Sequence, residues 1–177
     1  PFPAEAVARG GLIPLPDDVP FEAYGVIEPT LSVIGCQDKL DVNFRDTVVI
    51  LGAGPVGRLH ADIAKIRGAK KVIMTEISSD RLEGVEDFGV DVKIDSSKCD
   101  PVQAVLDETD GVGADKVISA NPSTVSQQQA LLMAKPGGYI SFFGGVPKGA
   151  MTEIDSNIIH YKGLWISGQT GGTAFAF

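Results

Sequence analysis

The chain has 177 residues, a length that fits one domain, or one domain with a fragment of a second. Hydrophobic residues make up 44% and charged residues 21%, which excludes a collagen-like, disordered or disulfide-scaffold protein. The net charge of −8 provides no uniform positive field, so neither nucleic acid nor a membrane is expected as a partner. A ligand that bears phosphate must therefore be held by local geometry.

The two cysteines, Cys36 and Cys99, occur without a CxxC motif or a histidine at metal-ligand spacing. We expect both to be buried, reduced thiols. No apolar stretch approaches the ~20 residues that cross a bilayer, and the first residues lack the basic and apolar segments of a signal peptide. These features predict a cytoplasmic protein.

The first twenty residues are rich in proline, and an alternating stretch over residues 4–9 favours one irregular strand followed by a loop. This segment is too short and irregular for a fold of its own. A helix is expected within residues 21–37, after Pro29, where it would lead into the following sheet.

From Thr47 onward, short runs rich in β-branched residues alternate with helical patterns. This alternation predicts an α/β protein with a doubly wound sheet of six parallel strands joined by crossover helices. The predicted strands cover residues 48–51, 71–75, 90–94, 114–119, 139–143 and 164–167.

Capping residues mark the helices between these strands. The first predicted helix, residues 58–67, places Leu59, Ile63 and Ile66 on one face and ends at Gly68. The second predicted helix is capped by Ser78 or Ser79 and ended by Gly89. The third begins at Asp100-Pro101 and stops near Gly111, and the fourth is capped by Ser123 or Thr124 and ended by residues 136–138.

A GxGxxG motif lies between the first predicted strand and the first predicted helix. Its first glycine would allow the tight turn, its second would let the backbone approach a pyrophosphate, and its third would let the helix lie close to the strands. The unpaired N–H groups at the start of the helix would then face the phosphates. The predicted cofactor-binding residues of this turn are Gly52, Gly54, Pro55, Val56 and Gly57.

Glu76 ends the second predicted strand, where the dinucleotide-binding fold places an acidic residue. Its carboxylate could accept hydrogen bonds from both ribose hydroxyls and would repel a 2′-phosphate, which predicts NAD rather than NADP. The alternative is a solvated acid at a strand end. Arg81 is expected to lie along the adenine or the ribose, although a purely structural role also fits it.

The loops after the last three predicted strands are expected to line the nicotinamide half of the cofactor, because ligands of open parallel sheets bind beyond the carboxyl ends of the strands. Glycines there would let a flat ring approach closely, but they could also be ordinary loop glycines. The residues predicted to contact this half are Asn121, Phe143, Gly144, Gly145, Gln169, Thr170 and Gly171.

Several further motifs accompany the glycine turn. They are the segments 13–20 (IPLPDDVP), 27–33 (IEPTLSV), 75–78 (TEIS) with Arg81-Leu82, 113–118 (GADKVI) and 135–138 (KPGG). With these motifs the chain resembles the cofactor domain of the medium-chain, zinc-dependent alcohol dehydrogenases, in the branch of the sorbitol and threonine dehydrogenases. The resemblance covers nearly the whole chain.

The resemblance implies a longer, two-domain enzyme that oxidises a secondary alcohol or polyol with NAD. Residues 1–20 would then be a remnant of the catalytic domain and residues 21–177 the NAD-binding Rossmann domain. The Cys and His-Glu zinc ligands of the family are not found here, so zinc is expected only in the full enzyme, and this chain alone would be inactive. The family pattern places Glu28 near the catalytic zinc and the substrate, with a structural role at a helix start as the rival. Where the family's polyol dehydrogenases tend to have an arginine and a tyrosine after the sixth strand, this chain has Gln169 and Thr170, followed by Gly171, which argues against sorbitol itself as the substrate.

Other functions also fit parts of the pattern. A non-catalytic NAD(H) sensor would need no zinc ligands. A methyltransferase would share the glycine-rich turn and the acid, although the GxGxxG spacing disfavours it. His60 and His160 could be proton shuttles, but surface or capping roles are expected for both. The apolar sixth strand, residues 163–168 with Trp165, predicts a homo-oligomer that pairs through this edge.

Overall fold

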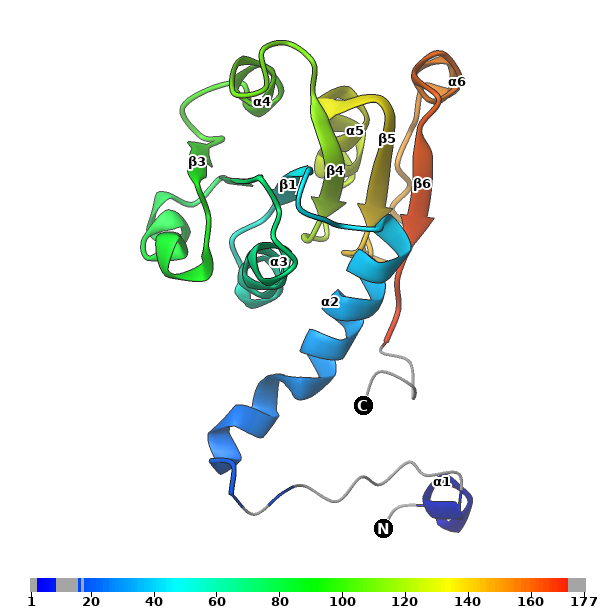
Figure 1. The fold of residues 1–177 in the computed structure, drawn as a ribbon. Helices are drawn as coiled ribbons and strands as arrows, with labels where there is room; N and C mark the ends of the chain where they lie inside the picture. The colour runs from blue at the N-terminus through cyan, green and yellow to red at the C-terminus, as the bar shows by residue number, and fades with distance from the viewer. Residues whose placement is uncertain (1–2, 9–15, 17, 172–177) are drawn as a thin grey trace.

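The computed structural model describes residues 3–8, 16 and 18–171. Its centre is a sheet of six parallel strands in the order β3-β2-β1-β4-β5-β6 (Figure 1). The strand order reverses between the neighbouring strands β1 and β4, so the predicted doubly wound sheet is confirmed. The strands are β1 (Thr47–Leu51), β2 (Lys71–Glu76), β3 (Val92–Asp95), β4 (Ala114–Ser119), β5 (Ala134–Phe142) and β6 (Trp165–Gly168).

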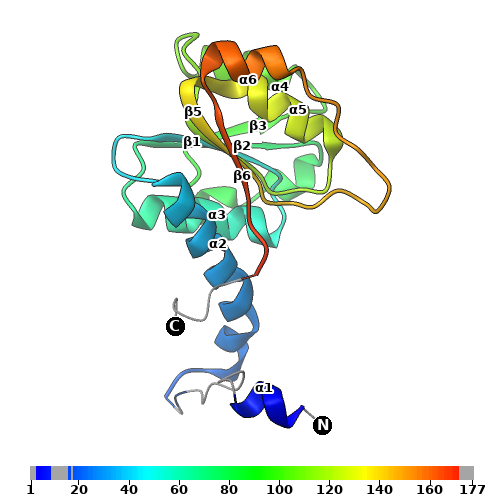
Figure 2. The same cartoon turned by 90° about the vertical axis from the view of Figure 1, so that its right-hand side faces the viewer.

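Helices cover both faces of the sheet, with α2 and α3 on one face and α4, α5 and α6 on the other (Figure 2). The short helix η1 and the first half of α2 extend away from the sheet. The helices are α1 (Ala4–Ala8), η1 (Phe21–Val26), α2 (Ile27–Leu40), α3 (Pro55–Ile66), η2 (Ser79–Leu82), η3 (Val85–Phe88), α4 (Pro101–Asp107), α5 (Thr124–Met133) and α6 (Ser156–Lys162).

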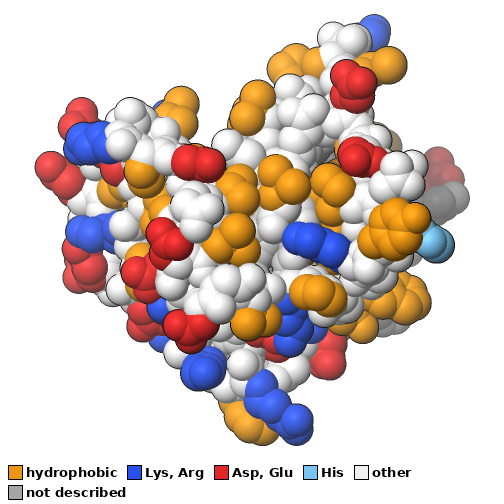
Figure 3. Space-filling model, turned by 90° about the horizontal axis from the view of Figure 1, so that it is seen from above, with side chains coloured by type: hydrophobic (Ala, Val, Ile, Leu, Met, Phe, Trp, Pro, Cys, Tyr) orange, Lys and Arg blue, Asp and Glu red, His pale blue; other side chains and the backbone are white. Residues whose placement is uncertain are grey.

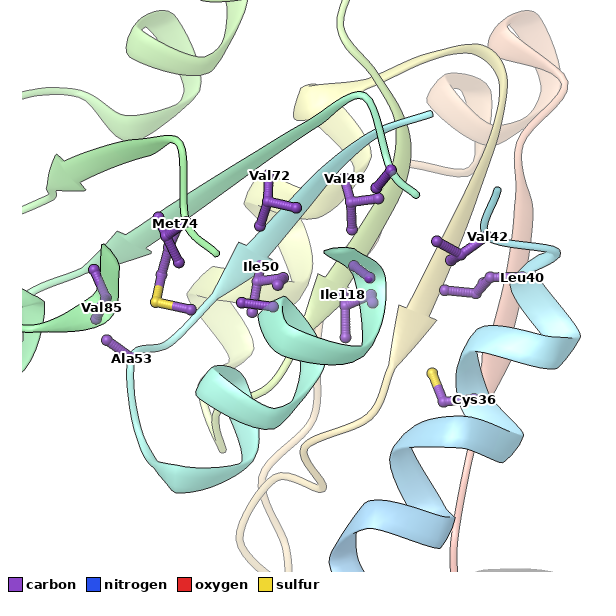
Figure 4. Close-up of a cluster of buried hydrophobic side chains, with 14 of the residues drawn as sticks. Cys36, Leu40, Val42, Val48, Ile50, Ala53, Val72, Met74, Val85 and Ile118 are labelled. Carbon is purple, nitrogen blue, oxygen red and sulfur yellow. The ribbon is translucent and has the colours of Figure 1, made fainter. Parts of the chain in front are cut away.

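The core has two layers because successive side chains of each strand point to opposite faces. In β1, Val48 and Ile50 join the layer under α2 and α3 (Figure 4), whereas Val49 and Leu51 join the layer under α4, α5 and α6. All four side chains are almost completely buried. This double burial is what a central parallel strand requires, and it explains why β1 reads as a continuous apolar run.

The packing of α3 differs from the face indicated by the sequence. The buried residues of this helix are Gly57, His60, Ala61 and Ala64, whereas Ile66 is 72% exposed. A β-carbon on Gly57 would lie 1.9 Å from the backbone oxygen of Gly52, so the helix lies close to the strand-end turn and small alanines follow on that face. Close approach to the sheet, rather than side-chain hydrophobicity, selects the inward face of α3.

Two predicted helix starts are confirmed by their caps. The carboxylate of Asp100 accepts a hydrogen bond from the Val102 N–H at 2.9 Å, and the hydroxyl of Ser123 accepts one from the Ser126 N–H at 3.3 Å. Ser123 rather than Thr124 is therefore the cap of α5. The helix α6 was not predicted, and its cap is the carboxylate of Asp155, which accepts from the Asn157 N–H.

Three local predictions are wrong. Residues 78–89 form two short 3₁₀ helices instead of one helix, because Gly84 between them takes a left-handed φ of 68°. Residues Ala4–Ala8 form a helical turn rather than a strand, since alanine favours helix and no neighbouring strand in the described residues pairs with them. The strand β5 begins at Ala134, opposite Ala114, so residues 136–138 lie within an irregular strand instead of closing α5.

Candidate cofactor-binding site

The glycine turn lies between β1 and α3, as predicted. Gly52 has a φ of 113°, a conformation that favours glycine, and its N–H donates to the Thr75 carbonyl of β2 at 2.8 Å. A β-carbon on Gly52 would also lie 3.2 Å from the Asn121 side chain, which follows β4. The turn is therefore packed tightly against the ends of both neighbouring strands.

The start of α3 is open toward solvent. Gly54 is the N-cap and has no neighbouring atom within 4 Å of the position that a β-carbon would occupy. Pro55 follows at the first helical position, and no side chain caps the helix. The N–H groups of Val56 and Gly57 consequently have no partner within the helix and are available to an anion.

The carboxylate of Glu76 is held in place by three backbone N–H groups. One oxygen accepts from the Ala53 N–H of the glycine turn at 2.9 Å, and the other accepts from the Ile77 and Ser78 N–H groups at 2.9 and 3.1 Å. Glu76 is only 8% exposed, so it is not a solvated acid at a strand end. The orientation of this carboxylate is fixed by the strand end and the turn that it joins.

Three grooves, A, B and C, follow the carboxyl edge of the sheet, and each is lined by residues predicted to bind the cofactor. These predicted residues are Glu76, Arg81 and Asn121 in groove A, Gly54, Pro55 and Arg81 in groove B, and Phe143, Gly145, Gln169 and Thr170 in groove C. Groove A, of about 500 Å³, lies over β2 and β4 and is lined by Thr75, Glu76, Ile77, Arg81, Ser96, Pro101, Asn121, Pro122, Ser123, Val125, Ser126 and Gln129. Groove B, of about 530 Å³, is lined by Val26, Ala53, Gly54, Pro55, Arg58, Leu59, Arg81 and Phe88. Groove C, of about 500 Å³, lies after β5 and β6 and is lined by Lys39, Phe142, Phe143, Gly145, Gly168, Gln169 and Thr170.

Arg58 is a site residue that the sequence analysis missed. Its guanidinium donates to the carbonyls of Ala53, Arg81 and Glu83 at 3.3, 3.0 and 3.1 Å. The guanidinium carbon also lies 5.3 Å from the centroid of the Phe88 ring. The side chain thereby ties the glycine turn to the segment after β2 and places a positive charge in groove B. Its position directly after GxGxxG is the sequence signal that could have identified it.

Gly144 was predicted to contact the cofactor, but it supports the loop after β5 and does not line groove C. Its N–H donates to the Ser119 carbonyl at 2.7 Å, and a β-carbon there would lie 2.3 Å from the Asn121 carbonyl oxygen. The loop after β5 is therefore pressed against the end of β4. Gly171 adopts a left-handed φ of 62°, and its carbonyl accepts from the Gln169 side chain at 2.7 Å.

Both histidines and Glu28 lie outside the three grooves. The surface role expected for His60 is wrong, because its ring is fully buried between Gln37 and Phe143, and burial lowers its pKa to about 3. His160 is exposed on α6, beside Tyr161. Glu28 is exposed on the first turn of α2, where its carboxylate accepts from the Ser32 hydroxyl at 3.2 Å.

The two cysteines differ in their exposure to solvent. Cys36 is buried and free, as predicted, but Cys99 is free and exposed, so the prediction of its burial is wrong.

Among the described residues, no group of three or more His, Cys, Asp or Glu side chains is arranged to hold a metal ion. No helix among these residues has the length and apolar character needed to span a bilayer. Seen from the side of α4 and α6, acidic and basic side chains are interspersed (Figure 3).

The fold and the carboxyl-edge grooves define a doubly wound nucleotide-binding domain. The family model described as zinc-binding dehydrogenase matches residues 55–176. The chain therefore belongs to the zinc-binding dehydrogenases, and its resemblance to the cofactor domain of the medium-chain enzymes is confirmed.

Curated relatives and solved structures agree with this family. The L-threonine 3-dehydrogenase of Symbiobacterium thermophilum is 32% identical over 87% of the chain and 43% of its own length, and that of Pyrococcus horikoshii is 38% identical over 71% of the chain and 36% of its own length. The chain spans less than half the length of the curated relatives that it matches.

Two solved structures are similar in fold and sequence. The benzyl alcohol dehydrogenase of Acinetobacter calcoaceticus has a TM-score of 0.82 and 28% identity, over 88% of this chain and 43% of that one. A candidate zinc-binding dehydrogenase of Sinorhizobium meliloti, solved with NADP bound, has a TM-score of 0.81 and 26% identity, over 85% of this chain and 45% of that one.

Proposed function

We propose that this chain binds NAD(H) as the cofactor domain of a zinc-dependent dehydrogenase that oxidises a secondary alcohol or a polyol. The hydroxyl on carbon 3 of threonine is a secondary alcohol, so the L-threonine 3-dehydrogenases among the relatives support this substrate class. In this proposal residues 21–177 form the cofactor domain and residues 1–20 belong to the catalytic domain. The protein would act in the cytoplasm, where an exposed thiol such as Cys99 stays reduced.

The observation that carries the proposal is the hydrogen bond between the Glu76 carboxylate and the Ala53 N–H of the glycine turn. This bond joins the two elements that a dinucleotide must contact together, the ribose acceptor and the pyrophosphate cradle. The pyrophosphate would lie over Gly54 and accept from the N–H groups of Val56 and Gly57. The adenosine would then occupy groove A, along Glu76 and Arg81.

The nicotinamide end is proposed to lie in groove C. A dinucleotide that is fixed at β2 by its adenosine and at β1 by its pyrophosphate continues across β4 toward β5 and β6. Phe143, Gly145, Gln169 and Thr170 line that part of the edge. Bound NAD would supply the acceptor for the hydride, while these residues orient its ring.

The zinc of the family is not assigned to this chain. The described residues offer no ligand set for it. Glu28, on the part of α2 that extends away from the sheet, is proposed to lie near the metal and the substrate in the complete enzyme. We expect the 177-residue chain to bind the cofactor without oxidising alcohols, with or without added zinc.

Selectivity for NAD is proposed to depend on Glu76. A carboxylate fixed by three N–H groups cannot turn away from a 2′-phosphate, and its negative charge would repel that group. The solved neighbour with NADP shows that the family fold also accepts the phosphorylated cofactor. The preference of this chain must therefore come from its own residues.

Replacement of Glu76 tests both the site and its selectivity. In the Glu76→Gln variant we expect about tenfold weaker NADH binding and a reduced preference for NADH over NADPH, because an acceptor for the ribose and a repelling charge are both lost. Titration of nicotinamide fluorescence measures both constants. Glu83→Gln, the same change at an exposed site, should leave them unaltered. Tighter binding of NADPH than of NADH by the unaltered chain would contradict the assignment.

A further inference from the structure

The loop after β5, residues 143–145, is held by a side chain that lines none of the three grooves. Gln127, on α5, is 6% exposed, and its side-chain amide donates to the Gly144 carbonyl at 3.2 Å. The oxygen of the same amide accepts from the Thr152 hydroxyl. One buried side chain therefore holds both the start and the far end of the segment that runs from β5 toward α6.

The two hydrogen bonds fix the orientation of this amide. If the amide were turned over, its oxygen would face the Gly144 carbonyl oxygen, and two acceptors would oppose each other. The hydroxyl of Thr152 selects the orientation in which the amide nitrogen faces Gly144. Because the Gln127 side chain is itself buried, losing this bond would leave its amide without an easy replacement from solvent.

The same loop is contacted from the opposite face of the sheet. The ring of His60, on α3, lies edge-to-face against Phe143, with centroids 4.6 Å apart and planes at 89°. Gln37, on α2, donates to the backbone carbonyl of His60 at 2.8 Å and supports that helix position. With Gly144 fixed on β4 as well, the loop is held from both layers and from the sheet.

We propose that Gln127 is a positioning residue for the nicotinamide end of the cofactor, acting through the carbonyl of Gly144, with His60 as its counterpart on the other face. The inference rests on the proposed function, because it assumes that groove C receives the nicotinamide. Gln127 sets where Phe143 and Gly145, which line that groove, present their surfaces. A loop that is placed before binding loses less freedom when the ring enters.

The test compares NADH with ADP-ribose, which lacks the nicotinamide ring, in the 177-residue chain. The Gln127→Glu variant keeps the size of the side chain but places an acceptor against the Gly144 carbonyl. We expect its affinity for NADH to fall about tenfold while its affinity for ADP-ribose stays the same. Gln128→Glu is the matched control, since Gln128 is the next residue of α5, is exposed, and contacts the carbonyl of Glu153 instead.

Each outcome has a defined meaning. Equal loss for both ligands, no loss for either, or the same loss in Gln128→Glu would overturn the inference. If the unaltered chain bound neither ligand, the proposed function itself would fail, and the inference with it. Should Gln127→Glu not fold by circular dichroism, Thr152→Val is the second variant, because it leaves Gln127 in place and frees the amide to turn. Thr152→Val should weaken the binding of NADH more than that of ADP-ribose, by a smaller factor than Gln127→Glu. An unchanged ratio of the NADH and ADP-ribose affinities would overturn the inference.

Discussion

At the scale of single residues, His60 shows how far packing can change the chemistry of a side chain. Its ring is fully buried, and among the described residues its Nε2 atom has no hydrogen-bond partner. Burial disfavours the charged imidazolium and lowers the pKa from 6.5 to about 3. The neighbours Gln37 and Phe143 carry no charge that would offset this effect.

The buried imidazole makes the stability of the chain depend on pH. Because the unfolded chain binds a proton at His60 below pH 6.5 and the folded chain does so only near pH 3, the free energy of unfolding should fall as the pH falls through this range. The expected slope is about 1.4 kcal/mol per pH unit from this residue. Urea unfolding at pH 7 and pH 5 measures it, and His60→Phe should reduce the difference. Equal slopes in both proteins would show that His60 titrates normally.

At the scale of elements, the end of α5 depends on a lysine from another helix. The ammonium group of Lys162, on α6, donates to the carbonyls of Leu131, Leu132 and Ala134 at 3.2, 2.9 and 2.8 Å. These carbonyls lie at the carboxyl end of α5, where a positive charge is favourable and partners are otherwise missing. The contact fixes α6 against α5 and leads the chain into β6.

Removal of this ammonium group should destabilise the fold. We expect Lys162→Met to lower the free energy of unfolding by about 2 kcal/mol, because three carbonyls lose a charged donor while most of the aliphatic stem is kept. Thermal or urea unfolding measures the change. Lys148→Met, at an exposed loop position, serves as the control and should be neutral. An effect as small as that of the control would mean that water replaces the ammonium group.

Residues could be placed from the sequence where their position is determined by nearby residues in the chain. The GxGxxG spacing and the acid at the end of β2 are set by backbone geometry within one βαβ unit, so Gly52 and Glu76 could be placed correctly. His60 could not, because its burial depends on the approach of α2 to α3, which no local pattern records. The lining of groove A could not be predicted for a similar reason. Ser96, Pro101 and Gln129 come from three separate segments of the chain, and only the order of the strands in the sheet brings them together.

At the scale of the whole molecule, the sheet ends at β6 with an exposed apolar edge. Trp165 is 65% exposed and stacks on Tyr139 of β5, with ring centroids 6.0 Å apart. Ile166 and Tyr161 add further exposed apolar surface near this edge. Such an edge is usually covered or paired, and a second copy of the chain is the proposed partner.

Association through β6 can be measured on the isolated chain. We expect sedimentation velocity to show dimers whose fraction rises with concentration, and Trp165→Lys to shift the population to monomer, because a charge would be placed in the apolar contact. The matched variant Ile66→Lys alters an exposed apolar residue on α3 and should not shift it. A monomer at every concentration would contradict the proposed pairing.

The central place of β1 in the sheet has a consequence for the folding of the chain. This strand pairs on one side with β2, which follows it closely, but on its other side with β4, where Val48 lies opposite Lys116. During synthesis the ribosome must release a long stretch of chain before that second edge can be paired. Until then a strand that is apolar on both faces keeps an open edge, and this interval is where a chaperone or a slow aggregation step should act on the nascent chain.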